Sequence, residues 1–166
     1  IQIRTVVWSN VNRVRETRTA SVAQTFRQKL TLGHIGLYAF LGDDVVGHFW
    51  GEPSGARRTR AWGGIDFGPY EVLLAWGWVH PNHRGQGIFQ SLISHLSHTI
   101  RNQCPDQQIV ADVPLKPLSS LYAHRRMGYR LYGRLDYVTV ARRLVYHRFQ
   151  ALNDEVADAL LNKRSE

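Results

Sequence analysis

Residues 71–89, EVLLAWGWVHPNHRGQGIF, join a nearly uninterrupted apolar run to a turn that contains two glycines. Residues 71–79 have the length and composition of a central strand covered on both faces, and Pro81 marks the end of that strand. After Gly87, apolar residues recur about every fourth position, which predicts an amphipathic helix from residue 87 to residue 100. A strand, a glycine-containing turn and a helix therefore follow one another directly.

The start of this helix has the properties of an anion site. A helix that begins after glycines exposes unpaired backbone N–H groups at the positive end of its dipole, and glycine lets a phosphate approach them closely. Arg84 adds a positive charge to the same turn. A Walker loop and a dinucleotide fingerprint are both absent, so nucleotide hydrolysis and hydride transfer lose support. The turn predicts a site for a phosphate-bearing ligand; the alternative is a turn that only introduces a core helix.

The rest of the chain alternates between strand and helix patterns and predicts a mixed α/β fold in a single domain over residues 1–166. We expect strands at 1–7 and 108–113, helices at 20–30 and 118–127, and a hairpin formed by 35–41 and 45–51. Residues 52–70 predict a long surface loop, and residues 130–143 a final hairpin or long strand. Residues 147–163 predict a C-terminal helical extension.

Composition narrows the class of protein. The formal net charge of +8 attracts polyanions, but the arginines are scattered along the chain, as is typical of a solvated surface. The single cysteine, Cys104, excludes an internal disulfide and favours a reducing compartment. No stretch approaches the roughly 20 apolar residues of a membrane span. We therefore expect a cytoplasmic protein.

Two histidine pairs raise the question of a metal. His80 and His83 form one pair in the turn, and His95 and His98 form another on the predicted helix. A zinc site needs three or four converging ligands, and solvated histidines explain both pairs. We expect no metal.

The turn resembles the acyl-CoA signature of the GNAT superfamily of N-acetyltransferases, Arg/Gln-x-x-Gly-x-Gly/Ala. The matching residues are Arg84-x-x-Gly87-x-Phe89, after a strand that ends in Val79-x-Pro81. Phe89 stands where Gly or Ala is usual, and we expect the following helix to supply its packing site. Residues 119–129 resemble the late tyrosine helix of the family, and the order of elements over residues 1–143 follows that of the family.

The resemblance implies a fold. It is a mixed α/β (α+β) fold whose central sheet has six to seven mostly antiparallel strands and about four flanking helices. The sheet is splayed between strands 71–79 and 108–113, and the gap holds the pantetheine arm of the cofactor.

The resemblance also implies a reaction, the transfer of an acyl group from acetyl-CoA or another acyl-CoA to a primary amine by direct attack. A backbone N–H near Gly77 would polarise the thioester carbonyl. The cofactor-binding residues implied are Gly77, Trp78, Val79, Arg84, Gly85, Gln86, Gly87, Ile88, Phe89 and Gln90.

Three side chains are candidates for proton transfer. Tyr122 matches the position of the family's acid, and a phenol is protonated at neutral pH. Glu71 is the first candidate for the base and Asp112 the second. The alternative for each is an ordinary surface charge at the end of a strand. A core tyrosine is the alternative for Tyr122.

Alternation along residues 71–79 places four small or medium side chains on the face of Glu71 and both tryptophans on the other. The four are Leu73, Ala75, Gly77 and Val79, and the tryptophans are Trp76 and Trp78. We take this as a hypothesis of room for an acyl group larger than acetyl.

The acceptor is expected to be a small-molecule or peptide amine rather than nucleic acid, and a homodimer is compatible with this prediction. The alternative function is a non-catalytic module that binds CoA or nucleic acid through its basic surface.

Overall fold

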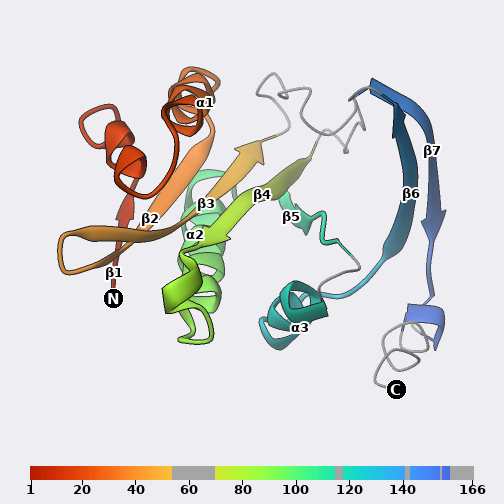
Figure 1. Cartoon of the computed structure of the whole chain (residues 1–166). Coiled ribbons are helices and arrows are strands. Elements are labelled where there is room, and N and C mark those ends of the chain that lie inside the picture. The colour runs from red at the N-terminus through yellow and green to blue at the C-terminus, as the bar shows by residue number, and fades with distance from the viewer. Residues whose placement is uncertain (54–69, 115–117, 141–142, 154, 158–166) are drawn as a thin grey trace. The chain divides into compact units, whose positions relative to one another are not determined.

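The computed structural model describes residues 1–53, 70–114, 118–140, 143–153 and 155–157 (Figure 1). The chain divides into two compact units. The first comprises residues 1–58 and 67–127, and the second comprises residues 59–66 and 128–166. The predicted loop 52–70 lies mostly outside the described residues, although its first two residues belong to a strand.

A five-stranded sheet forms the centre of the first unit. Its strands, in spatial order, are β1 (Gln2–Thr5), β2 (Ile35–Leu41), β3 (Asp44–Pro53), β4 (Glu71–Val79) and β5 (Gln108–Ala111). The first three pairings are antiparallel and β5 runs parallel to β4. The predicted hairpin is confirmed, with Gly42 at a φ of 59° in the turn between β2 and β3.

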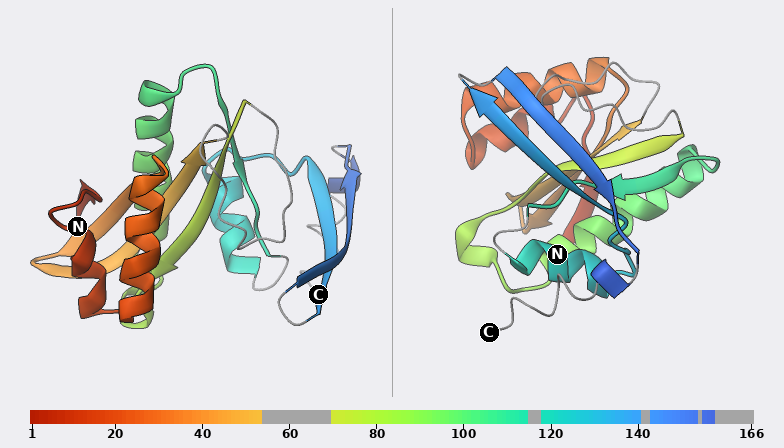
Figure 2. Two further views of the ribbon diagram at one scale, coloured as in Figure 1. Left: turned by 90° about the horizontal axis from the view of Figure 1, so that it is seen from above. Right: turned by 90° about the vertical axis from the view of Figure 1, so that its right-hand side faces the viewer.

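Helices α1 (Ala20–Thr31) and α2 (Ile88–Gln103) cover opposite faces of this sheet (Figure 2). Phe26 of α1 packs edge-on against Trp50 of β3, together with residues of the 3-10 helix η1 (Val11–Glu16). On the other face, Leu92 and Ile100 of α2 fill the space that the missing side chains of glycines in β3 leave open. The apolar stripe predicted for α2 is therefore its buried face.

A third helix, α3 (Leu118–Arg126), follows β5. Gly128 comes two residues after its end with a φ of 84°, the left-handed conformation expected after a helix. Among the described residues, the structure contains no helix with the length and apolar character needed to cross a membrane.

The strands β4 and β5 part within the sheet, as predicted. They pair only from Glu71–Gln108 to Leu74–Ala111, while β4 continues to Val79. Pro114 follows β5 closely and has no N–H to continue a ladder. The second half of β4 is therefore unpaired on its β5 side in the described structure.

The second unit contains the hairpin β6 (Gly133–Val140) and β7 (Arg143–Ala151). These strands pair with each other in a separate two-stranded sheet. Within the described residues, the central sheet therefore has five strands rather than the predicted six to seven. The helix predicted at 147–163 is wrong over residues 147–151, because cross-strand pairing with β6 holds them in β7. Residues 155–157 are helical, and residues 158–166 lie outside the described part.

Candidate functional site

The turn between β4 and α2 carries two glycines in a conformation that other residues rarely adopt. After the 3-10 helix η3 (Pro81–His83), Gly85 has a φ of 77° and Gly87, the N-cap of α2, a φ of 76°. A side chain built on either glycine would meet no heavy atom within 4 Å. The glycines therefore serve the backbone conformation and leave the outer side of the turn open.

The turn presents a row of backbone donors. The first recorded backbone hydrogen bond of α2 runs from the Ser91 N–H to the Gly87 carbonyl, at 3.0 Å. In the described part of the chain, the amides from Gly85 to Gln90 donate to no backbone carbonyl. These N–H groups lie at the positive end of a 16-residue helix. Such an arrangement of donors at a helix start favours an anion.

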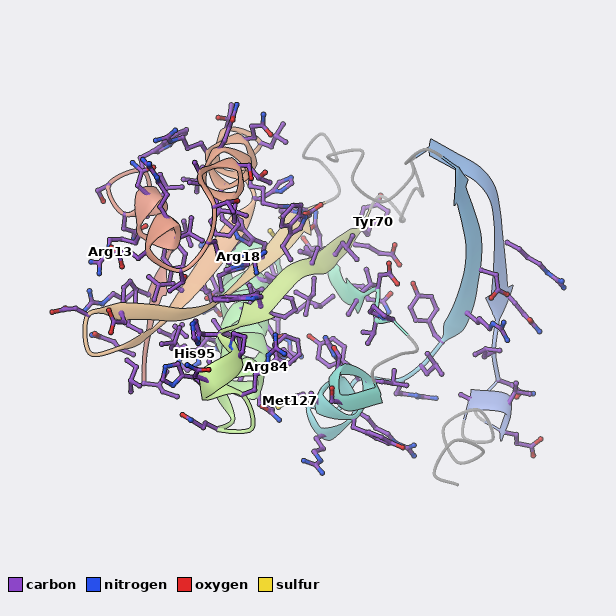
Figure 3. All side chains as sticks on the ribbon, in the orientation of Figure 1. Arg13, Arg18, Tyr70, Arg84, His95 and Met127 are labelled. Atoms are coloured by element: carbon purple, nitrogen blue, oxygen red, sulfur yellow. The ribbon has the colours of Figure 1, made fainter. Side chains whose placement is uncertain are left out.

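Arg84 is held beside this turn. Its Nε donates to the carbonyl of Val79, at 3.2 Å, and ties the side chain to the C-terminal end of β4 (Figure 3). The residue is otherwise exposed. Its guanidinium thus contributes a positive charge next to the open amides.

A β-bulge interrupts β4 just before this turn. In the register with β3, His48 faces Trp78 and Trp50 faces Ala75, so that Trp76 and Gly77 together oppose one residue of β3. Trp76 has a φ of 57°, a rare conformation for a bulky side chain. Gly77 is exposed, and no described residue is its register partner on either side.

The bulge reverses the predicted alternation along β4. Trp76 packs with Leu73 and Ala75, and Trp78 stacks on His48, which contacts Phe26 of α1. All five side chains therefore lie on the face that α1 covers. Gly77 instead faces Phe89 of α2. The grouping of Gly77 with Leu73 and Ala75 is therefore wrong, and the hypothesis of a roomier acyl site loses its basis.

Phe89, where the family signature has a small residue, packs against Gly77. A Cβ on Gly77 would lie 2.8 Å from ring atoms of both Phe49 and Phe89. The Phe89 ring also lies 5.3 Å from that of Phe49 and 5.6 Å from that of His124. Phe89 thus has packing partners in β3, β4 and α3; that its own helix also contributes stays a prediction.

The helix α3 brings a histidine to this cluster that sequence reasoning missed. His124 is buried, and its Nδ1 donates to the Ser120 carbonyl at 2.8 Å. Burial lowers the pKa of His124. Tyr122, the predicted acid, is half-buried on the same helix. The only local signal for His124 was its position two residues after the predicted acid.

The two predicted bases lie at different ends of the β4–β5 pairing. Glu71 begins β4 opposite Gln108, six residues before Gly77. Asp112 follows the last paired residue of β5, where the strands part. Burial raises the pKa of the Asp112 carboxyl. The structure therefore does not bring the two carboxylates to one point.

A buried polar cluster on the α1 face was also missed. Lys29 of α1 forms an ion pair with Glu52 of β3, and both side chains are almost fully buried. The Lys29 Nζ lies 4.9 Å from the centroid of the Trp76 ring. His48 is buried beside it. No sequence motif marks this cluster, because its members come from distant parts of the chain.

The described residues contain no group of three or more His, Cys, Asp or Glu arranged to hold a metal ion. The pair His80 and His83 lies in the turn, with ring centroids 5.5 Å apart.

Three features define the class of fold, which is that of the GNAT acetyltransferases. They are the order of strands in the sheet, the parting of β4 from β5, and the turn with left-handed glycines before α2. No family model and no curated protein matches the sequence. Solved structures do match this chain, and three of them show the degree of similarity.

The aminoglycoside N-acetyltransferase AAC(6')-Iy, solved with CoA, is 18% identical with a TM-score of 0.63, over 84% of this chain and 98% of that one. The ribosomal-protein-alanine N-acetyltransferase of Brucella melitensis is 18% identical with a TM-score of 0.58, over 84% and 86% of the chains. The yncA protein of Salmonella typhimurium, solved with acetyl-CoA, is 20% identical with a TM-score of 0.63, over 91% and 92%. At these identities the likeness establishes the GNAT fold of this chain.

Proposed function

We propose that this protein is an acyl-CoA-dependent N-acyltransferase that transfers an acetyl group from acetyl-CoA to a primary amine. The observation that carries the proposal is the turn from Gly85 to Gln90, where two left-handed glycines and the start of α2 expose a row of amides beside the free half of β4. A pyrophosphate fits such a turn, because amides and helix dipole both favour an anion. The acetyl-CoA thioester would supply an activated acyl group.

The unpaired half of β4 is the proposed place for the pantetheine arm, along Gly77, Trp78 and Val79. Strand backbone without a neighbour offers N–H and C=O groups for pairing with an extended amide chain. The N–H of Gly77 is the proposed donor to the thioester carbonyl, where charge develops during attack. Arg84 and the amides up to Gln90 complete the cofactor-binding set.

We propose Tyr122 as the acid that protonates the departing thiolate. The change Tyr122→Phe is expected to lower kcat by about 10²-fold or more, since general acid catalysis contributes that order of rate. CoA affinity should stay within about twofold. Tyr70→Phe is the matched control, because Tyr70 is 71% exposed at the other end of β4. Steady-state kinetics with acetyl-CoA measures both variants, and an unchanged kcat in Tyr122→Phe would exclude this role.

For the base, Asp112 comes before Glu71 in our proposal. Six residues of extended strand separate Glu71 from Gly77, about 20 Å, which is too far for direct proton transfer at Gly77. Asp112 lies where β4 and β5 part, and burial raises its pKa towards the range of a working base. Glu71 remains a candidate through a water relay.

Acetyl is the acyl group we propose, because one protein of similar fold is solved with acetyl-CoA as its cofactor.

The acceptor is proposed to be a small-molecule or peptide amine, met in the cytoplasm. Two proteins of similar fold are named for an aminoglycoside and for a ribosomal protein alanine, respectively. An acceptor panel should therefore contain amino sugars and peptides with free N-termini.

The proposal is tested in two stages. Calorimetric titration with CoA and acetyl-CoA is expected to give saturable binding, and the panel of amines is then screened for release of free CoA thiol. The Cys104→Ala variant removes the protein's own thiol from that assay. Binding to oligonucleotides that weakens steeply with salt, with no binding of CoA, would instead support the non-catalytic alternative.

A further inference from the structure

The β4 bulge leaves a backbone group that needs a partner. Trp76 and Gly77 have no register partners on β3, so the ladder does not satisfy the Trp76 carbonyl. A buried carbonyl without a partner is costly, and a bulky residue at positive φ persists only where its surroundings hold it. Something outside the ladder therefore stabilises the bulge.

His48 supplies that partner. Its Nδ1 lies 2.9 Å from the Trp76 carbonyl oxygen, and because a carbonyl only accepts, Nδ1 carries the proton. The side chain is 2% exposed, and burial lowers its pKa to about 4, so the ring is neutral at physiological pH. The tautomer with the proton on Nδ1 is thus set by the bulge.

The same imidazole also holds the residue on the other side of Gly77. The His48 ring stacks on that of Trp78, with centroids 5.5 Å apart and an angle of 21° between the planes. Arg18 covers the Trp78 ring, with its guanidinium carbon 4.8 Å from the ring centroid. One side chain therefore contacts both neighbours of Gly77, the carbonyl before it and the indole after it.

His48 is itself fixed in place. The ring of Phe26 from α1 meets it edge-on, with centroids 4.8 Å apart. The indole of Trp76 is held from the same side by Lys29. The orientation of the peptide between Trp76 and Gly77 thus depends on contacts from the α1 face, while Gly77 itself faces α2.

We propose that His48 is a positioning residue of the acyltransferase reaction, which holds the Trp76–Gly77 peptide so that the Gly77 N–H is directed at the thioester carbonyl. This rests on the proposed function, because it assigns the task of that N–H to a particular support. His48 contacts neither the cofactor nor the acceptor in this role.

The test uses the thioester carbonyl as a probe. Acetyl-CoA labelled with ¹³C at the carbonyl is bound to the whole chain, and isotope-edited infrared spectroscopy measures the carbonyl stretch. Hydrogen bonding from Gly77 is expected to move this stretch to lower frequency in the wild type. His48→Phe keeps an aromatic ring but removes the donor, so the shift should be largely lost while CoA affinity stays within about twofold. His48→Asn, which retains a donor close to the position of Nδ1, should restore most of the shift.

His34→Phe is the matched control. His34 is also buried and also has a pKa lowered to about 4. Its Nδ1 lies 3.9 Å from the Glu52 carboxylate, beyond hydrogen-bond distance, and unlike His48 it makes no hydrogen bond to the Trp76 carbonyl in the described structure. Its replacement should cost stability without changing the carbonyl stretch. If His48→Phe does not fold, His48→Gln takes its place, because its donor is displaced by one methylene.

The outcomes separate the two proposals. A wild-type protein that binds neither CoA nor acetyl-CoA would overturn the proposed function. A wild-type shift that persists unchanged in His48→Phe or His48→Gln would overturn the positioning role and leave the proposed function standing.

Discussion

At the scale of single residues, the fold is most sensitive to substitution of the buried pair of Lys29 and Glu52. Both side chains lie out of contact with water, where each charge depends on the other. Desolvation lowers the pKa of Lys29, although the neighbouring carboxylate opposes that change. Because Lys29 also contacts the Trp76 ring, the pair supports Trp76 and with it the bulge.

Removing one member should therefore destabilise the fold. Lys29→Met leaves the Glu52 carboxylate buried without its partner and is expected to cost about 3–5 kcal/mol in the free energy of unfolding. Urea denaturation measures the loss. The double variant Lys29→Met, Glu52→Met should recover most of it, because apolar side chains of similar volume replace the pair. A loss below about 1 kcal/mol in the single variant would show that the pair is not buried in solution.

The glycines of the turn give a second prediction at this scale. Gly87→Ala forces an alanine into a left-handed conformation, at a cost of about 1–2 kcal/mol, although there is space for the methyl group. The methyl group would stand beside the open amides, so the Kd for acetyl-CoA should rise by about tenfold or more. Calorimetric titration checks this.

Gly33 provides the control for that variant. It has a φ of 74°, also with nothing within 4 Å of the added carbon, but lies between α1 and β2. Gly33→Ala should cost the same stability and leave the Kd unchanged. An equal change of Kd in both variants would contradict an anion site at the turn.

At the scale of elements, the bulge in β4 decides which face of the sheet each side chain of the site occupies. It directs Trp76 and Trp78 to the α1 face and turns Gly77 towards α2. Phe89 can replace the usual small residue because Gly77 and β3 accommodate its ring. Phe89 and Gly77 therefore depend on each other.

A double-mutant cycle tests the dependence of Phe89 and Gly77 on each other. Gly77→Ala places a methyl group 2.8 Å from the rings of Phe49 and Phe89 and is expected to cost about 1–3 kcal/mol through overpacking. Phe89→Ala should remove part of that cost when combined with it, so the two changes are not additive. Thermal unfolding of the four proteins measures the coupling, and strict additivity would contradict the contact.

At the scale of the whole molecule, buried histidines link folding to pH. Burial lowers the pKa of both His34 and His48 to about 4, whereas an unfolded chain binds these protons near pH 6.5. Between pH 6.5 and 4 the unfolded state thus holds more protons than the folded one, and stability rises with pH. The contribution is complete above pH 6.5 and is lost as pH falls towards 4.

The slope should reach about 1.4 kcal/mol per pH unit for each of the two histidines within this window. Carboxylates also titrate in the lower part of this pH window, so the wild type is compared with His34→Gln. The slope of the unfolding free energy against pH should be smaller in this variant, by up to about 1.4 kcal/mol per pH unit. Calorimetric unfolding from pH 4 to pH 7 measures it. Equal slopes in wild type and His34→Gln would contradict the prediction.

Local patterns in the sequence were sufficient for much of this protein. The period of apolar residues predicted the main strands and helices of the first unit, and the glycines after residue 84 predicted the turn, because both depend on neighbours along the chain. The resemblance of that turn predicted the fold that the solved structures share. The roles of the predicted site residues stay predictions.

Only the tertiary structure decided the rest. The bulge at Trp76 depends on register with β3, so alternation along β4 placed Gly77 on the wrong face. Residues 147–151 carry a helical pattern but pair with β6, since hydrogen bonds across strands override local propensity. The contacts of His48 and the pair of Lys29 with Glu52 join segments far apart in the chain. The local sequence thus predicted the strand and turn of residues 71–89, whereas the packing of other segments against them set the direction of their side chains.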